Sequence, residues 1–344
     1  MAPSAKTGRV TIKTVAEDAG VSVAAVSKVL RDAYGVSAAL RAKVQASMVK
    51  LGYRPHTAAR GMRGHTYTLG LMLPDLHNPF FSDIYAGVNV ALERTQYQTL
   101  LGISDSETSI EGALIEAMID RQMDGLILLG PRIPGSEVVK VAARIPTVVL
   151  AYYYGAPDVN FDTVNNDDQL GARLVVQHLV AAGYKHIAFL SQEIPDMGKA
   201  MVTSQREIGY RDAMQAAGLG RHIQVAYSPQ TSRETQNVAR HMLQSRNPPD
   251  AIFCWTDFIG LEVLSVAKEL GLSVPGDLAV VGYDNTAYCD LAQNSLTSID
   301  QSGQVLGLQS ARLLIERIKG RENPEHYVVT PRLVARGSTQ PRRP

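Results

Sequence analysis

The sequence predicts a small all-α helix-turn-helix headpiece, followed by a larger α/β body of two doubly wound lobes. Three observations lead to this prediction. Apolar residues recur at helical spacing near the N-terminus, short apolar runs alternate with amphipathic stretches after Thr68, and the two parts have opposite net charge.

Two short helices that cross at a glycine turn are predicted between Val15 and Leu30, which read VAEDAGVSVAAVSKVL. Ala16, Gly20 and Val26 have the spacing of a helix-turn-helix unit. Ser22 stands where an N-cap would open the second helix, so the exposed first turns of that helix would face a DNA major groove. The residues on those turns are Val23, Ala24, Ser27 and Lys28.

A third helix is predicted from an N-cap at Ser37 to a stop at Gly52. Its apolar residues at helical spacing are Val36, Leu40, Val44, Met48 and Leu51.

The segment after Pro55 reads HTAARGMRGHTYT and has the composition of a linker. Ala58, Ala59 and Met62 can share one face of a short helix, although Gly61 and Gly64 weaken that helix. We expect the segment to become helical only when a partner orders it.

Charge divides the chain at the same place. The first 66 residues contain eleven basic and three acidic residues. Because the whole chain has 34 basic and 33 acidic residues, the remainder holds 23 basic and 30 acidic ones. A basic head on an acidic body is typical of a protein whose head contacts nucleic-acid phosphates.

The body contains seven short apolar runs separated by stretches of helical length. This alternation is typical of parallel, doubly wound sheets, and there are more runs than one sheet of ordinary width holds, so two lobes are expected. The runs lie at 68–73, 99–104, 125–130, 146–153, 187–191, 251–255 and 278–284, and a last strand is expected from Tyr327 to Ala335.

The commonest catalytic and metal-binding motifs are absent from the sequence. It has no GxGxxG after a strand, no GxxxxGK[ST], no GxSxG, no HExxH and no CxxC. We therefore expect no enzyme, no cofactor and no metal, and we expect Cys254 and Cys289 to be reduced thiols. The lack of a secretory signal or a long apolar segment favours a cytoplasmic protein.

Ligands of open α/β sheets bind beyond the carboxyl ends of the strands. Polar and aromatic residues follow three of the apolar runs, and a cleft lined by them would suit a small polar metabolite. These residues are Asp75, Asn78 to Phe81, Thr256, Asp257, Asp284 and Asn285. Other interpretations stay open, since the two phenylalanines can belong to a helix core, the aspartates can be caps or turn formers, and Arg206 can be a surface ion-pair partner.

In its order of segments the whole chain resembles the LacI/GalR family of bacterial transcriptional regulators. The headpiece segments VTIKTVAEDAGVSVAAVSKVL, VSAALRAKV and LGYRPHTAARGM are the most specific part of the resemblance. The body adds LGLMLPDLHNPFFSDIYAGV, DDQLGA, the RxxGY pattern from Arg206 to Tyr210, VVGYDN and LTSIDQ.

The resemblance implies a headpiece over residues 1–56, a hinge helix over 57–66 and an effector-binding and dimerisation domain of the periplasmic-binding-protein fold over 67–344. Lobe 1 would comprise about 67–165 and 299–327, and lobe 2 about 166–298 and 328–340. It also implies a homodimer on a pseudo-palindromic double-stranded DNA operator. A small-molecule effector between the lobes, expected to be a sugar or a related metabolite, would control operator affinity, and repression is the expected sense of regulation.

Position by position, the resemblance also assigns the DNA contacts. The backbone-phosphate contacts it implies are Thr11, Ser22, Ser27, Ser37 and Tyr53. The base-reading positions it implies are Val23, Ala24 and Lys28, and polar discrimination would come from Lys28 and the neighbourhood of Arg31 and His56. Val23 and Ala24 lack hydrogen-bonding side chains, so readout there would be apolar. On the hinge, beside Ala59, Met62 takes the position of an apolar minor-groove wedge, or alternatively packs hinge against hinge.

For the effector the resemblance implies contacts from Asn78, Phe80, Phe81, Arg206, Thr256, Asp257, Asp284 and Gln301. The chain departs from the family pattern where Ala151-Tyr152 replaces an acidic pair and Ser228 replaces an aromatic residue. Tyr152, Tyr153, Trp255 and Tyr227 could then reshape the pocket toward an acid or an aromatic ligand. Two rival classes are a solute-binding protein that serves a transporter and a sugar-processing α/β enzyme.

Overall fold

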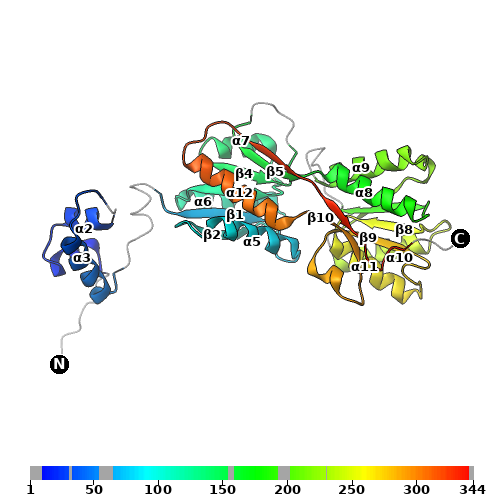
Figure 1. Ribbon diagram of the computed structural model, residues 1–344, viewed down its shortest axis with the longest axis horizontal. Helices are drawn as coiled ribbons and strands as arrows, with labels where there is room; N and C mark the ends of the chain where they lie inside the picture. The colour runs from blue at the N-terminus through cyan, green and yellow to red at the C-terminus, as the bar shows by residue number, and fades with distance from the viewer. Residues whose placement is uncertain are drawn as a thin grey trace, which may run out of the picture. The chain divides into compact units, whose positions relative to one another are not determined.

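The computed structural model describes residues 10–30, 33–53, 65–153, 159–192, 202–229 and 231–340 (Figure 1). The chain divides into two compact units, Met1–Thr66 and Tyr67–Pro344.

The first unit contains the predicted helix-turn-helix. Helix α1 (Ile12–Asp18) and helix α2 (Val23–Leu30) are followed by helix α3 (Ala38–Leu51). Val15, Val26 and Val44, one from each helix, are fully buried together. Gly20 joins α1 to α2 with a φ of 58°, in the left-handed region that glycine adopts without steric cost.

Polar side chains cap the three helices at their N-termini. The Thr11 and Thr14 hydroxyls of α1 each accept a hydrogen bond from the other residue's backbone N–H. Ser22 Oγ accepts from the Ala25 N–H at 3.1 Å, and Ser37 Oγ accepts from the Leu40 N–H at 3.2 Å. The predicted caps at Ser22 and Ser37 are therefore confirmed, as is the stop at Gly52, which is left-handed.

The described residues of the second unit form two six-stranded sheets, one in each lobe, which confirms the predicted two-lobe α/β body (Figure 1). The sheet of lobe 1 has the order β11 (His326–Val329), β5 (Asp162–Asn166), β4 (Thr147–Leu150), β3 (Gly125–Leu129), β1 (Thr68–Leu73), β2 (Gln98–Ile103). The sheet of lobe 2 has the order β12 (Arg332–Val334), β10 (Thr297–Asp300), β9 (Ala279–Asp284), β8 (Ala251–Cys254), β6 (Ile187–Gln192), β7 (Gln224–Ser228). Only the β10–β12 pair among these is antiparallel.

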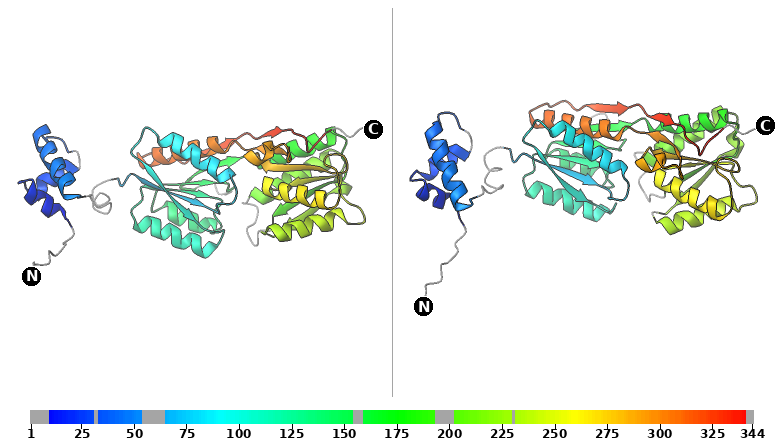
Figure 2. Two further views of the ribbon diagram at one scale, coloured as in Figure 1. Left: turned by 90° about the horizontal axis from the view of Figure 1, so that it is seen from below. Right: turned by 60° about the horizontal axis from the view of Figure 1, so that its bottom comes forward.

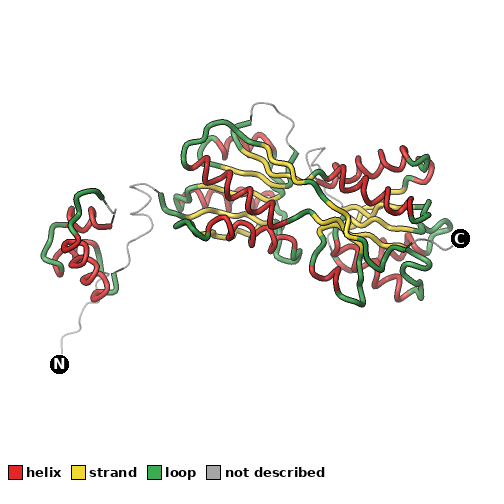
Figure 3. Tube along the Cα trace, in the orientation of Figure 1, coloured by secondary structure: helices red, strands yellow, loops and turns green. Residues whose placement is uncertain are grey.

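Helices cover both faces of each sheet, as Figures 2 and 3 show. In lobe 1, α5 (Phe80–Leu92) and α12 (Gly303–Ile318) lie on one face, and α6 (Thr108–Asp120) and α7 (Gly135–Ala142) on the other. In lobe 2, the corresponding pairs are α8 (Asp168–Ala181) with α9 (Val202–Ala216), and α10 (Ser232–Leu243) with α11 (Asp257–Glu269). Short 3-10 turns occur at Gly220–His222 and Ala287–Asp290.

Each sheet separates two apolar cores, because side chains alternate between its faces. On β1, Leu69 and Leu71 pack beneath α5 and α12, whereas Met72 packs beneath α6. Helices α5 and α12 approach each other at glycines: a Cβ added to Gly307 would lie 1.9 Å from the Ile84 carbonyl oxygen, and one added to Gly87 would lie 2.0 Å from that of Gln304.

The chain crosses between the lobes after β5, after β10 and after β11. Strand β10 extends lobe 2 to Asp300, and β11 extends lobe 1 to Val329, each two residues beyond the expected limits at 298 and 327. The single strand predicted from Tyr327 to Ala335 is wrong. Pro331 has no N–H for a ladder, and β11 and β12 on its two sides belong to different sheets.

None of the helices in the described ranges is long and apolar enough to cross a membrane.

Candidate functional site

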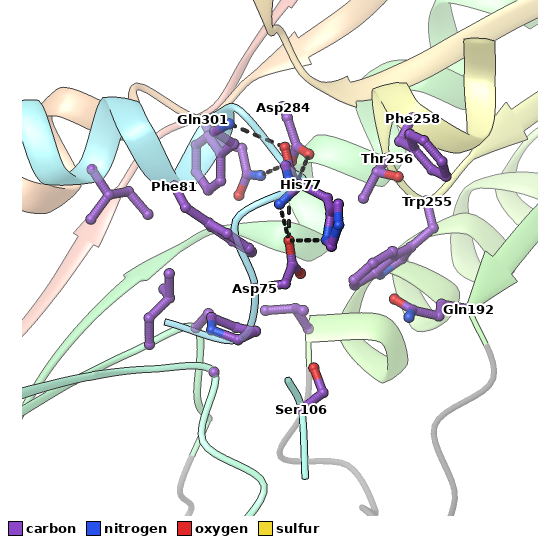
Figure 4. Close-up of a pocket in the computed structure, with 18 of the residues that line it drawn as sticks. Asp75, His77, Phe81, Ser106, Gln192, Trp255, Thr256, Phe258, Asp284 and Gln301 are labelled. Atoms are coloured by element: carbon purple, nitrogen blue, oxygen red, sulfur yellow. Dashed lines mark hydrogen bonds and ion pairs between the residues drawn. The ribbon is translucent and has the colours of Figure 1, made fainter. Parts of the chain in front are cut away.

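A cavity of about 560 Å³ opens between the carboxyl ends of strands from both lobes. Lobe 1 contributes the segments that follow β1, β2 and β3, and lobe 2 contributes those that follow β6, β8 and β9. The volume lies within the usual range of small-molecule sites. Figure 4 shows the side chains of the two lobes facing this space.

Asp284, at the end of β9, is the centre of a hydrogen-bonded group in the cavity wall. Asn78 Nδ2 donates to its Oδ2 at 2.8 Å, and Gln301 Nε2 donates to its Oδ1 at 2.6 Å. Asn78 Oδ1 accepts from the Phe80 N–H at 3.1 Å, which fixes the orientation of the Asn78 amide. Burial raises the pKa of Asp284 to about 8, despite the opposing effect of the Arg206 charge. A carboxyl with so perturbed a pKa in a cleft marks a candidate binding site.

Arg206 on α9 forms a second polar group in the cavity wall. Its Nε donates to Asp168 Oδ1 at 2.8 Å, and its Nη1 donates to the Trp255 carbonyl oxygen at 2.5 Å. The guanidinium also lies 3.6 Å from the ring centroid of Tyr283. Only 4% of the Arg206 side chain and 1% of the Asp168 side chain are exposed, so the alternative of a surface ion pair is wrong.

Aromatic side chains supply flat apolar surfaces to the cavity. Phe81 comes from lobe 1, and Trp255 and Phe258 come from lobe 2, on opposite sides of the pocket in Figure 4. Phe80 also lines the cavity and is buried in the core beneath α5. Its alternative role as a core residue is therefore confirmed, and its role as an effector contact stays a prediction. Such rings can pack against a ligand ring from two sides.

Two residues predicted as effector contacts do not line the cavity. The chain bends at Ala151, which has a φ of 55°, so that Ala151 lines the cavity while Tyr152 packs with Phe161 in the core of lobe 1. Asp257 accepts hydrogen bonds from the Thr286 N–H at 2.7 Å and from Ser298 Oγ at 2.5 Å, so its carboxylate is engaged inside lobe 2.

Four other positions that the sequence singled out differ in their relation to the cavity. Thr256 lines the cavity and also caps α11 through its bond with the Ile259 N–H. Tyr153 reaches Asp168 Oδ2 with its hydroxyl at 2.7 Å. Tyr227 and Ser228 do not line the cavity: the first donates to Glu207 and the second bonds Thr235 inside lobe 2.

Sequence reasoning missed several residues of the cavity wall, among them Arg132, Asn166, Asp168 and Gln192. Arg132 comes shortly after the apolar run that forms β3, so the strand-end rule could have found it. Asn166 ends a strand of polar sequence that the search for apolar runs did not detect.

The second candidate site is the outer face of α2. Ser22, Val23, Ala24 and Lys28 are exposed there, and the exposed fraction of Val23 is 40%. Ser27 is only 8% exposed, so the prediction that it shares this face is wrong. Its side chain lies with those of Val26 and Val29 on the side of α2 that is turned to the helical core.

Of the other predicted DNA contacts, Thr11 and Ser37 are exposed and Tyr53 is half-buried. Arg31, His56, Ala59 and Met62 lie outside the described residues.

Both the headpiece and the body of the chain match known protein families. Residues 11–56 match the family described as bacterial regulatory proteins, lacI family, and residues 176–339 match the periplasmic binding protein-like domain. The chain is 31% identical to the HTH-type transcriptional repressor CytR of Escherichia coli (strain K12) over 335 residues, which cover 96% of each protein. It is also 31% identical to the catabolite control protein A of Priestia megaterium over 307 residues, 89% of this chain and 91% of that one.

Among solved structures, the complex of the transcriptional regulator CelR with cellobiose superposes with a TM-score of 0.70 and 29% identity, over 96% of this chain and 100% of that chain. These relatives are regulators that carry the same headpiece and body, not enzymes. The chain belongs to the LacI family of bacterial transcriptional regulators.

Proposed function

We propose that this regulator binds a small-molecule effector in the cavity between its lobes and that the effector controls its affinity for a DNA operator. The observation that supports this most directly is the cavity of about 560 Å³, whose wall includes the hydrogen bond between Asn78 of lobe 1 and Asp284 of lobe 2. A ligand that engages both lobes binds one arrangement of the lobes better than another. Such differential affinity is what an allosteric effector needs.

The effector contacts in this proposal come from both lobes. They are Asn78, Phe80, Phe81, Arg206, Trp255, Thr256, Asp284 and Gln301, all of which line the cavity. Amide and carboxyl groups can bind hydroxyls, and the aromatic rings can pack on a sugar ring, as befits a relative of a regulator solved with cellobiose. A coupling free energy of about 1–3 kcal/mol would change operator affinity by about 5- to 150-fold.

The headpiece, residues 1–56, would place α2 in the major groove, with the hinge at 57–66 and the effector domain at 67–344. Val23, Ala24 and Lys28 would meet base edges, and exposed hydroxyls such as Ser22 and Ser37 would meet phosphates. We further propose a cytoplasmic homodimer on a pseudo-palindromic operator, with repression as the sense of regulation. The exposed Leu100 and Leu101 on the edge strand β2 are candidates for the dimer surface.

The test is selection of fragmented DNA from the source organism on the purified full-length protein, followed by sequencing. Enrichment of a short inverted repeat supports the proposal, and enrichment of no sequence argues against it. The double variant Lys28→Ala and Met62→Gly should then bind the enriched fragment more weakly and with a smaller salt dependence. Lys140→Ala, on the exposed side of α7, is the control and should bind as the wild type does. Unchanged affinity and salt dependence in the double variant would show that the DNA surface is assigned wrongly.

A further inference from the structure

Arg132 brings a positive charge to the cavity wall. It follows β3 at the carboxyl edge of the lobe 1 sheet and lines the cavity. Within the ranges that the structure describes, its guanidinium makes no ion pair and no hydrogen bond; Glu111 and Glu107 act on it only through space. Arg206, the other arginine of the cavity wall, is already paired with Asp168.

Glu111 on α6 is a nearby carboxylate, but it does not form an ion pair with the Arg132 guanidinium. Its Oε2 accepts the backbone N–H groups of Arg132 at 2.7 Å and Ile133 at 2.9 Å. The carboxylate is buried and binds the loop backbone instead of the guanidinium. The loop is therefore held in place while the charged end of the side chain remains available.

A guanidinium in this position is unfavourable without a counter-charge. Burial lowers the pKa of Arg132, but an arginine stays protonated at any physiological pH. A partly buried, unpaired charge lacks both full hydration and a partner, so it favours an anion that can supply the partner.

The negative groups of the cavity wall do not supply that counter-charge. Asp168 is paired with Arg206, and the raised pKa of Asp284, about 8, keeps most of that carboxyl neutral near pH 7. Asp75 accepts the backbone N–H groups of His77 and Asn78, and Asp105 is exposed. None of these carboxyl groups forms an ion pair with Arg132 in the described part of the chain, so its guanidinium can pair with an anionic ligand.

Two more atoms of the wall lack partners and fit an oxygen-rich ligand. Asn166 Oδ1 and Trp255 Nε1 are buried and have no hydrogen-bond partner in the described part of the chain. Asn166 Nδ2 donates to the Gln301 carbonyl oxygen at 3.0 Å, which fixes Oδ1 as the free acceptor. The pair offers one acceptor and one donor, which suits hydroxyl groups on a ligand.

We infer that the effector is an anionic metabolite, whose carboxylate or phosphate pairs with Arg132 while its ring lies between Phe81 and Trp255. A sugar acid and a sugar phosphate both have this chemistry. The inference rests on the proposed function, because it names the class of effector for the same cavity.

The test separates the metabolites of the source organism by charge. An extract is passed over an anion exchanger near neutral pH, and the flow-through and the anionic eluate are freed of salt and added to the full-length protein. Thermal unfolding reports binding, since a ligand of the folded state raises Tm. The inference expects the eluate to raise Tm and the flow-through to leave it unchanged. Stabilisation by the flow-through alone would overturn the anionic effector but leave the proposed function standing, and stabilisation by neither fraction would contradict both.

Variants then place the anion at Arg132. In Arg132→Gln the concentration of eluate needed for half of the Tm shift should rise about 10- to 100-fold, because a charge-assisted hydrogen bond is lost. Arg132→Lys keeps the charge without the bidentate geometry and should fall between that variant and the wild type. Arg121→Gln, at the exposed end of α6 in the same lobe, is the matched control and should respond as the wild type does. An Arg132→Gln protein that folds and responds like the wild type would overturn the assignment. If Arg132→Gln does not fold, Arg132→Lys takes its place, and a wild-type response of that variant would overturn the assignment.

The two sources of the anion are separated by enzymatic treatment of the eluate. Loss of the Tm shift after alkaline phosphatase identifies a phosphate ester, and survival of the shift identifies a carboxylate.

Discussion

Asn78 Nδ2 donates a hydrogen bond to Asp284 Oδ2 at 2.8 Å, and the two residues come from different lobes and lie 206 positions apart in the sequence. The bond is a direct link across the candidate effector site. Gln301, near a crossing between the lobes, donates to the other oxygen of the same carboxyl. A ligand that competes for these atoms would therefore act on the contact between the lobes themselves.

Asp284 makes the stability of the body depend on pH. Its pKa is about 8 in the folded chain and 3.8 in an ordinary aspartate, so between about pH 4 and pH 8 the folded state binds more protons than the unfolded state. The free energy of unfolding must then fall as pH rises through this range. Asp284→Asn removes the titration, and we expect the unfolding free energy of the wild type to fall relative to that of the variant from about pH 5 to about pH 8. Urea unfolding at several pH values measures it, with the exposed Asp212→Asn as control; a difference that does not vary with pH contradicts the shift.

Removal of one charge from the buried ion pair of Arg206 and Asp168 should lower the free energy of unfolding. Arg206→Met leaves Asp168 buried without its counter-charge, which should lower the free energy of unfolding by about 3–5 kcal/mol. The double variant Arg206→Met with Asp168→Asn removes both charges and should lose less than the single variant. Denaturant unfolding of the two proteins checks the order, and a double variant less stable than the single one speaks against the pair.

The close crossing of α5 and α12 requires Gly307. A Cβ there would lie 1.9 Å from the Ile84 carbonyl oxygen, so Gly307→Ala must push the helices apart, at a cost of about 1–3 kcal/mol. Gly112 on α6 has no heavy atom within 4 Å of an added Cβ, and Gly112→Ala should be neutral or stabilising by up to about 1 kcal/mol. Equal Tm values for the two alanine variants would show that the helices do not meet at Gly307.

Ser22 has two roles that substitution can separate. Ser22→Ala loses the cap of α2, about 1 kcal/mol, whereas Ser22→Asp keeps a capping oxygen. The aspartate would also set a negative charge against the DNA backbone, so operator affinity should fall further in Ser22→Asp than in Ser22→Ala. Amide hydrogen exchange in α2 reports the cap and fluorescence anisotropy reports the affinity. If Ser22→Asp binds DNA as well as the wild type, Ser22 does not lie beside a phosphate.

Local signals explain how much of the fold the sequence could predict. Ser22, Ser37 and Gly52 were found as helix boundaries because a cap depends on neighbouring residues alone. Strand β5, DTVNN, was missed because it is polar although buried. Its Asp162 is paired with Arg321 at 2.6 Å, 159 positions further along the chain, and no window of sequence reveals that partner.

The same contrast holds in the candidate site. The strand-end rule led to Asn78 and Asp284, which the structure brings together. It also pointed to Asp257, whose carboxylate binds Thr286 and Ser298 inside lobe 2. Whether a side chain after a strand meets the cavity or its own lobe depends on the packing of the next loop, which the sequence alone does not provide.

A ligand in the cavity should control operator binding. The most direct test is to measure the operator affinity of the full-length protein with and without the stabilising metabolite fraction, at one fixed salt concentration. We predict a change in Kd of about 5- to 150-fold for the wild type and a smaller change for Phe81→Ala, whose ring lines the cavity. An operator Kd that stays the same with the fraction present, under conditions in which that fraction raises Tm, would contradict the account.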